Sequence, residues 1–129
     1  MRTNSPTTVI VVDDDLSIRR ALKTQLESLG FDVLLFQSAE ELLGCKLPDG
    51  MSCLLVDIYL PGMTGIDLCR RLETSGHRRR TVLMSGRDDS RTREMIRDAK
   101  PIASLQKPFE EKSLLRAIRK ATRSAAKIP

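Results

Sequence analysis

Residues 9–15 read Val-Ile-Val-Val-Asp-Asp-Asp, an apolar, β-branched run that ends abruptly in three carboxylates. Such a run is typical of a buried strand, and apolar residues at helical spacing up to Gly30 predict a helix directly after it. Four more apolar runs recur, at residues 31–36, 53–56, 81–84 and 102–105, and each is followed by a helical pattern. The chain therefore alternates strands and helices from end to end.

Five strand-and-helix units predict an α/β fold with a single doubly wound five-stranded parallel sheet and five helices, because parallel strands need crossover connections. We expect the strands to be buried on both faces. Residues 8–122 are the expected domain, with tails at 1–7 and 123–129. Local signals place Asp15 as the N-cap of the first helix, Ser38 at the start of the second, and a turn at residues 47–50.

The composition limits the classes of protein to which this chain can belong. A chain of 129 residues with 40% hydrophobic and 30% charged side chains is a single folded domain, and its apolar runs are too short to span a bilayer. Residues 1–69 carry 5 basic and 10 acidic side chains, 5 − 10 = −5, whereas residues 70–129 carry 17 and 7, 17 − 7 = +10. With one Tyr, three Phe and no Trp, stacking residues are scarce, so we expect solvated basic helix faces and no direct nucleic-acid binding.

The N-terminus and the cysteines indicate the compartment. No apolar leader precedes the first strand, and Cys45, Cys53 and Cys69 are odd in number without any C-x-x-C spacing. We therefore expect a cytoplasmic protein with reduced thiols, no membrane partner and no zinc site.

Polar side chains end four of the five strands, and the carboxyl ends of parallel strands meet at one edge of a sheet. Asp13 and Asp14 end the first strand, Asp57 the third, Ser85 the fourth and Lys107 the fifth. Two carboxylates ~4 Å apart repel by roughly 4 kcal/mol at an effective dielectric constant of 20, so this group needs a cation besides the lysine, and oxygen ligands suit Mg²⁺. We expect Asp57 to be a phosphoryl-accepting nucleophile and the adjacent acids to hold the metal.

The residues resemble the receiver domain of two-component response regulators. The resemblance rests on four segments in order: Val-Val-Asp-Asp-Asp (11–15), Asp-Ile-Tyr-Leu-Pro-Gly-Met-Thr-Gly (57–65), Met-Ser-Gly (84–86) and Lys-Pro-Phe (107–109). It implies the strand order 2-1-3-4-5 and a cis bond between Lys107 and Pro108. It also implies a sensor histidine kinase or phosphotransfer protein as the phosphoryl donor, and a change of conformation that controls an output.

The resemblance also assigns roles to single residues. The metal ligands are Asp13, Asp14, Asp57 and the Tyr59 backbone carbonyl, and the phosphorylated residue is Asp57. Ser85 and Lys107 complete the catalytic set, with Ser85 as the switch hydroxyl. Such a domain is not an enzyme toward external substrates, because it catalyses only its own phosphorylation and dephosphorylation.

Three departures from the family pattern bear on signalling. Ser104 stands at the second switch position, where the family usually has an aromatic residue three places before the lysine. Lys100-Pro101 replaces the usual small pair, which alters the surface of the fourth helix, fifth strand and fifth helix through which the family forms homodimers. Tyr59 and Arg87 are expected to flank the mouth of the site and to restrict attacking water.

Three other functions fit parts of the pattern. A Mg²⁺-dependent aspartyl phosphatase of the haloacid dehalogenase class needs a second Asp two residues after the nucleophile, where Tyr59 stands. A flavin or nucleotide binder needs a phosphate-binding loop where Asp13, Asp14 and Asp15 would repel the anion. A receiver-like module that signals without phosphate is favoured by Ser104 and opposed by Asp57 and Lys107. The chain is either a stand-alone receiver or the first part of a longer regulator, commonly a transcription factor.

Overall fold

The computed structural model describes residues 7–47 and 52–126, with residues 123–126 as helix backbone only. The strands are β1 (Thr8–Val12), β2 (Asp32–Phe36), β3 (Ser52–Asp57), β4 (Arg80–Ser85) and β5 (Ala103–Gln106). The helices are α1 (Leu16–Ser28), α2 (Ala39–Leu43), α3 (Gly65–Thr74), α4 (Ser90–Ala99) and α5 (Glu111–Ala126). The five predicted units are therefore confirmed, and most of the predicted turn at 47–50 lies outside the described residues.

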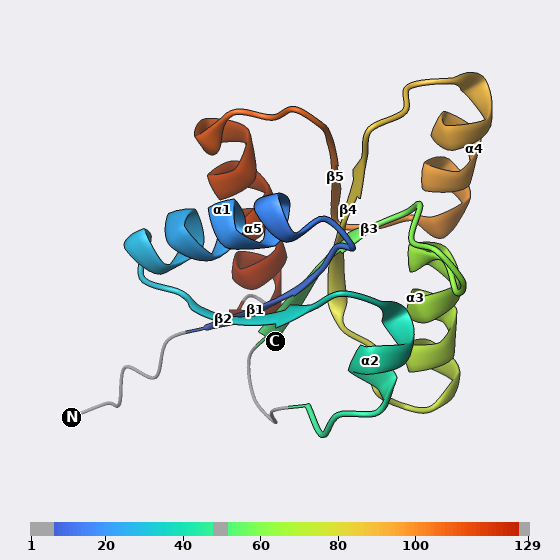
Figure 1. Ribbon diagram of the computed structural model, residues 1–129, viewed down its shortest axis with the longest axis horizontal. Coiled ribbons are helices and arrows are strands. Elements are labelled where there is room, and N and C mark those ends of the chain that lie inside the picture. The colour runs from blue at the N-terminus through green and yellow to red at the C-terminus, as the bar shows by residue number, and fades with distance from the viewer. Residues whose placement is uncertain (1–6, 48–51, 127–129) are drawn as a thin grey trace.

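The strands form one parallel sheet in the order β2-β1-β3-β4-β5, which confirms the predicted order (Figure 1). In the register of β1 with its neighbours, Val12 lies beside Phe36 and Val56. Asp13 therefore follows its strand at the same level of the sheet as Asp57, the last residue of β3. The register alone brings these two acids together at the carboxyl edge.

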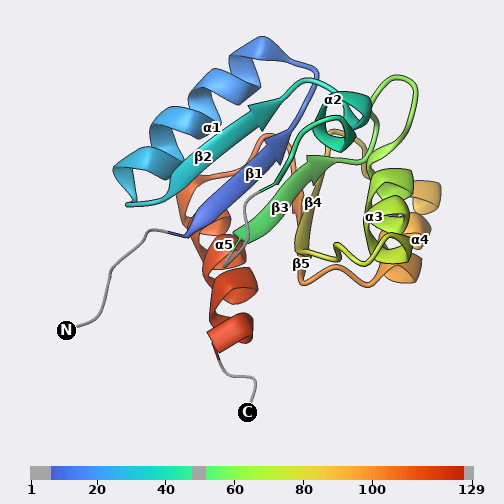
Figure 2. The same ribbon diagram turned by 90° about the horizontal axis from the view of Figure 1, so that it is seen from below.

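Helices cover both faces of the sheet, because alternate strand residues point to opposite sides. Val9 and Val11 pack with residues of α1 and α5, whereas Ile10 and Val12 pack with residues of α2 and α3. Figure 2 shows α1 and α5 on one side of the sheet and α2, α3 and α4 on the other. This three-layer arrangement leaves the carboxyl edge of the strands open for a site.

Burial on both faces is complete only at the centre of the sheet. Four of the five β1 residues and five of the six β3 residues are buried, as expected. The prediction was wrong for the edges: Leu34 of β2 is 37% exposed, and Leu105 is the single buried residue of β5. An edge strand has only one neighbouring strand, so a helix layer that ends there leaves its side chains partly exposed.

The helix ends follow the predicted signals. Asp15 caps α1 by accepting hydrogen bonds from the N–H groups of Ser17 and Ile18, at 2.8 and 3.2 Å. Ser38 caps α2 by accepting from the N–H of Glu41 at 3.0 Å. The Asp15 carboxylate is thus committed to its helix rather than to the acidic site.

The C-terminal helix extends farther than the sequence indicated. The domain was expected to end at residue 122, but α5 continues to Ala126. Across the described ranges, every helix is too short or too polar to cross a membrane.

The three cysteines are free thiols, in keeping with the expected reduced state. Burial in β3 raises the pKa of the Cys53 thiol to about 12. Cys53 is therefore a packing residue of the core and not a nucleophile.

Candidate functional site

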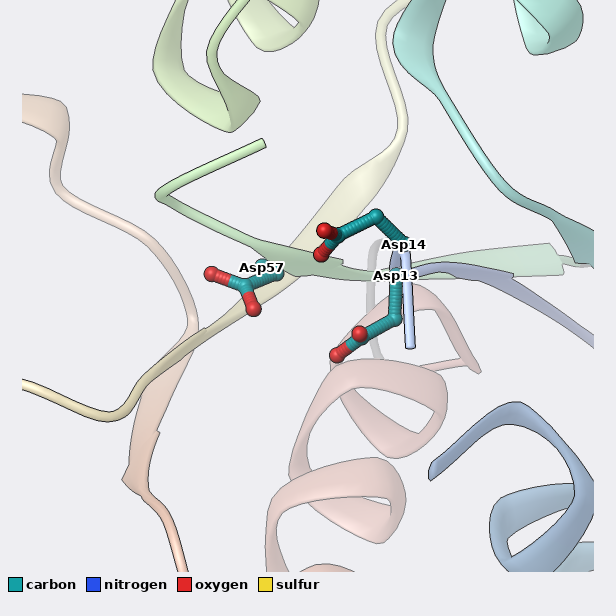
Figure 3. A group of neighbouring side chains, drawn as sticks. All are labelled: Asp13, Asp14 and Asp57. Carbon is teal, nitrogen blue, oxygen red and sulfur yellow. The ribbon is translucent and has the colours of Figure 1, made fainter. Parts of the chain in front are cut away.

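Three carboxylates meet at the carboxyl edge of the sheet. One oxygen from each of Asp13, Asp14 and Asp57 lies within 4.8 Å of the others. Figure 3 shows Asp13 and Asp14 leaving the segment after β1 and Asp57 leaving the neighbouring strand β3. Asp13 is fully buried and Asp57 is 7% exposed, whereas Asp14 lies on the surface. The structure thus brings together the three acids that the sequence singled out.

Lys107 binds two of these acids at once. Its ammonium nitrogen donates to Asp13 Oδ2 at 2.7 Å and to Asp57 Oδ2 at 2.6 Å. The lysine follows β5, and its peptide bond to Pro108 is cis, as expected. Burial by itself would lower the pKa of the Lys107 amine, but the hydrogen bonds and charges of the two carboxylates raise it above its usual value. Lys107 is therefore charged and neutralises part of the acidic cluster.

Asp13 is the most deeply placed of the acids. Burial raises the pKa of its carboxyl, while the Lys107 ammonium and the N–H of Asp15, which donates to Oδ1 at 2.9 Å, oppose that rise. Arg19 donates to the Asp13 backbone carbonyl at 2.7 Å and so holds the turn after β1 in place. A buried carboxylate with a raised pKa has an incomplete supply of positive charge.

The donor set fits a hard divalent cation. The three side chains offer oxygen ligands only, and the exposed Asp14 leaves one side open to water, which Mg²⁺ retains when it binds to proteins. The Tyr59 N–H donates to Asp57 Oδ1 at 2.8 Å, so the Tyr59 backbone is fixed beside the cluster. The residues present therefore suit Mg²⁺, in agreement with the chemistry expected from the sequence.

Ser85 lies at the end of β4, but its hydroxyl is engaged away from the acids. It donates to the Arg87 carbonyl oxygen at 3.0 Å and accepts from the Arg87 N–H at 2.9 Å. The side chain is 1% exposed. The site contains the predicted hydroxyl, but its one proton is already committed to a backbone acceptor.

Thr92 is a polar residue at this edge that the sequence analysis missed. It lies in α4, is 1% exposed, and shares a hydrogen bond between its hydroxyl and that of Tyr59. The Arg87 guanidinium lies over the Tyr59 ring, 4.2 Å from its centroid. A signal was present, because Thr92 precedes Met95 and Ile96 at helical spacing and so belongs to the inward stripe of α4.

Ser104 lies in β5 and its side chain is exposed. Beside it, a cavity of about 260 Å³ opens between α4 and the ends of β4 and β5. Its lining includes Ser85, Arg87, Thr92, Ile96, Ser104 and Leu105. A small side chain at this position therefore leaves space next to the predicted switch serine.

The loop after β3 is held against the strand that carries Asp57. The Gly65 N–H donates to the Ile58 carbonyl at 2.9 Å, and a Cβ atom on Gly65 would lie 2.3 Å from the Asp57 carbonyl oxygen. From α2, Glu40 accepts a hydrogen bond from the Met63 N–H at 3.1 Å. Only a glycine allows α3 to begin so close to Asp57.

Comparisons with known proteins agree with this geometry. A family model described as the response regulator receiver domain matches residues 9–119. Nodulation protein W of Bradyrhizobium diazoefficiens is 35% identical over 114 residues, which cover 88% of this chain and 50% of that protein. The transcriptional regulatory protein FixJ of the same organism is 31% identical over 117 residues, 91% of this chain and 57% of that protein. The chain spans about half the length of the curated relatives it matches.

Solved structures give the same result. The response regulator StyR superposes with a TM-score of 0.82 at 36% identity, over 95% of this chain and 62% of that one. FixJ-N superposes with a TM-score of 0.83 at 28% identity, over 92% of this chain and 95% of that one. The sheet order, the acidic cluster and these matches together show that the chain belongs to the receiver domain family of two-component response regulators.

Proposed function

We propose that Asp57 accepts a phosphoryl group from the phosphohistidine of a sensor kinase or phosphotransfer protein, in a Mg²⁺-dependent reaction. The observation that carries this proposal is the single ammonium of Lys107 bound to Asp13 and Asp57 within the three-carboxylate cluster. An ordinary surface ion pair joins one acid to one base, whereas here a half-buried lysine bonds to two acids. This arrangement suits phosphoryl transfer. The carboxylate that accepts the phosphoryl group has to be ionised, and the phosphoryl oxygens need cationic partners.

In this reaction an Asp57 oxygen attacks phosphorus as the P–N bond of the donor breaks. The electron pair of that bond returns to the imidazole, which takes a proton from solvent, and an acyl phosphate remains on Asp57. Mg²⁺, held by the oxygens of Asp13, Asp14 and Asp57, would supply positive charge to the phosphoryl oxygens. Lys107 supplies a second positive charge from the β5 side, and the Tyr59 N–H orients the Asp57 carboxylate.

Intact mass after incubation with Mg²⁺ and acetyl phosphate tests this assignment. The wild type is expected to gain the mass of one phosphoryl group, and Asp57→Asn is expected to gain none because the amide is a poor nucleophile. Asp67→Asn, at an exposed carboxylate in the first turn of α3, is the matched control and should gain the group normally. No gain in the wild type, or an equal gain in Asp57→Asn, would refute the assignment.

We propose further that phosphorylation controls an output through protein contact. The relatives of known length are about twice as long as the aligned segment, and one is named a transcriptional regulatory protein. The surface of α4, β5 and α5 is the proposed face for that contact or for a second copy of the chain. Ser104 and Lys100 are exposed on this surface. They make it more polar than it would be with an aromatic residue at position 104.

The phosphorylated state is expected to be long-lived because Tyr59 and Arg87, which stand two residues after Asp57 and Ser85 respectively, place bulky side chains beside the acceptor. Tyr59→Ala and Arg87→Ala should each shorten its lifetime by about threefold or more, since hydrolysis needs a water molecule in line with the acyl phosphate. The decay of the phosphorylated mass with time measures this effect. Arg91→Ala, at an exposed position of α4, serves as the control. Unchanged decay in both site variants would show that these side chains do not restrict water.

A further inference from the structure

The side chain of Tyr59 connects the acceptor loop to α4. Its backbone N–H donates to Asp57, and at the other end its hydroxyl shares a hydrogen bond with Thr92 and lies 3.9 Å from Met95 Sδ. One residue thus contacts both the predicted phosphorylation site and a helix that lies 33 positions farther along the chain.

The same tyrosine is connected to Ser85 through Arg87. The Arg87 guanidinium lies 4.2 Å from the centre of the Tyr59 ring, and the Arg87 backbone is held by two hydrogen bonds with the Ser85 hydroxyl. A serine hydroxyl has one proton to donate. When Ser85 donates to a phosphoryl oxygen, it therefore has to release the Arg87 carbonyl.

Helix α4 packs on the core through the partly buried side chains of Met95 and Ile96. Thr92 is its single buried residue among those that the structure describes. Next to Thr92 the cavity of about 260 Å³ beside Ser104 is unfilled by protein atoms. Asp89 caps the helix by accepting from the Thr92 N–H at 2.8 Å, and the hydroxyl bond to Tyr59 is the polar contact that joins its first turn to the acceptor loop.

We infer that Thr92 is a positioning residue that ties α4 to the empty acceptor site through Tyr59 and Arg87. The inference rests on the proposed function. Occupancy of the site draws the Ser85 hydroxyl away from Arg87, the guanidinium leaves the Tyr59 ring, and the bond between Tyr59 and Thr92 is released. The first turns of α4 then become free to move, although β5 carries no aromatic residue at position 104. Since coupling between two sites is reciprocal, loss of the tie also favours occupancy.

Hydrogen exchange of α4, with the beryllofluoride–Mg²⁺ pair as the probe of occupancy, tests this inference. In the wild type, peptides from residues 90–99 are expected to exchange about two- to tenfold faster when beryllofluoride and Mg²⁺ are bound, as expected for the loss of one hydrogen bond. In Thr92→Val, the empty protein should already exchange at the faster rate and change little on binding. Its affinity for beryllofluoride should rise by about two- to tenfold.

Three further variants test whether the hydrogen bond between Thr92 and Tyr59 couples α4 to the acceptor site or only stabilises the helix. Thr92→Ser keeps the hydroxyl and is expected to restore the wild-type difference. Tyr59→Phe removes the other half of the bond, and its effect should not add to that of Thr92→Val if both act through one contact. Thr122→Val is the control, because the Thr122 hydroxyl donates only within α5, to Ile118 at 3.0 Å and Arg119 at 3.3 Å.

Tyrosine fluorescence provides a second readout, because Tyr59 is the only tyrosine and the chain has no tryptophan. Emission should change on binding in the wild type and in Thr92→Ser, and should start near the bound value in Thr92→Val. If the wild type gains phosphoryl mass but Thr92→Val keeps the full exchange difference, the tie is wrong and the proposed function stands. If the wild type neither gains mass nor binds beryllofluoride, both are wrong.

Discussion

Replacing Lys107 with methionine is expected to lower the free energy of unfolding at pH 7 by about 3 kcal/mol, because two buried carboxylates would lose their shared cation. Lys107 donates to both acids at 2.7 Å or less, and its side chain is only 18% exposed, so water cannot fully replace it. Urea unfolding measures the loss. Lys112→Met, at an exposed position of α5, should be within about 0.5 kcal/mol of the wild type.

The pH dependence of this loss in stability shows whether the lysine stabilises the fold through its charge or through packing. The pKa of the Asp13 carboxyl is raised by burial even beside Lys107, and it rises further once the ammonium is gone. A folded state with a raised carboxyl pKa holds a proton that the unfolded chain has released, so stability falls as pH rises through that interval. The raised pKa of Lys107 means that the contribution of the lysine is constant below its ordinary pKa. The deficit of Lys107→Met should therefore be smaller at pH 5 than at pH 7.

Added Mg²⁺ should restore more stability to Lys107→Met than to the wild type, because the ion then supplies the positive charge that Asp13 and Asp57 lost with the lysine. Chelation of the metal should remove this gain. A deficit that is equal at both pH values and insensitive to Mg²⁺ would mean that Lys107 contributes through packing alone.

The Gly65→Ala variant is expected to lose both stability and phosphorylation. The new Cβ would lie 2.3 Å from the Asp57 carbonyl oxygen, 3.0 Å from its carbonyl carbon and 3.1 Å from Ile58 Cα, all of them backbone atoms. No side-chain rotation relieves such contacts, so either the end of β3 or the start of α3 has to move. We expect a loss of about 1–3 kcal/mol on unfolding, as for other overpacked sites. Because Asp57 belongs to the displaced strand, the rate of phosphorylation by acetyl phosphate should fall at least tenfold.

Gly44→Ala is the control for this variant. Its Cβ would meet only the carbonyl oxygens of Glu40 and Glu41, at 3.6 and 3.7 Å, with a backbone φ of −83° that alanine adopts freely. Near-wild-type stability and phosphorylation are expected. If Gly65→Ala matches Gly44→Ala in both stability and phosphorylation, the close approach of α3 to Asp57 is not required for either.

The apolar runs and their polar ends predicted most of this fold and the location of the site. Asp13 directly follows one apolar run and Asp57 another, so the two acids were expected to meet once the strands were aligned. The burial of Asp13 and exposure of Asp14 was not predictable, because the turn after β1 decides which of two adjacent acids faces inward. The expectation that the strands are buried on both faces also overstated the burial of β2 and β5, since the sequence does not show how far the helices cover an edge.

The contacts around Ser85 and Thr92 were beyond sequence reasoning for a different reason. The Ser85 hydroxyl donates to the Arg87 carbonyl, and this bond depends on the path of the loop that follows β4. The bond between Tyr59 and Thr92 joins residues 33 positions apart, and each is ordinary in its own segment. Such contacts depend on how the elements pack in three dimensions, and the local sequence around each residue does not predict them.

The order of the strands has a consequence for how the domain assembles. The three strands β2, β1 and β3 are complete once the chain has been synthesised through Asp57, yet the cation of the site follows β5, the last strand. Asp13 and Asp57 therefore belong to strands that precede β4 and β5 in the chain, and the protein cation that bonds to both of them comes from the far edge of the sheet. With one buried residue, β5 has little hydrophobic drive of its own. The two hydrogen bonds from Lys107 to Asp13 and Asp57 therefore also serve to fasten the end of this edge strand, so we expect the assembly of β5 to be sensitive to the charge of the acids.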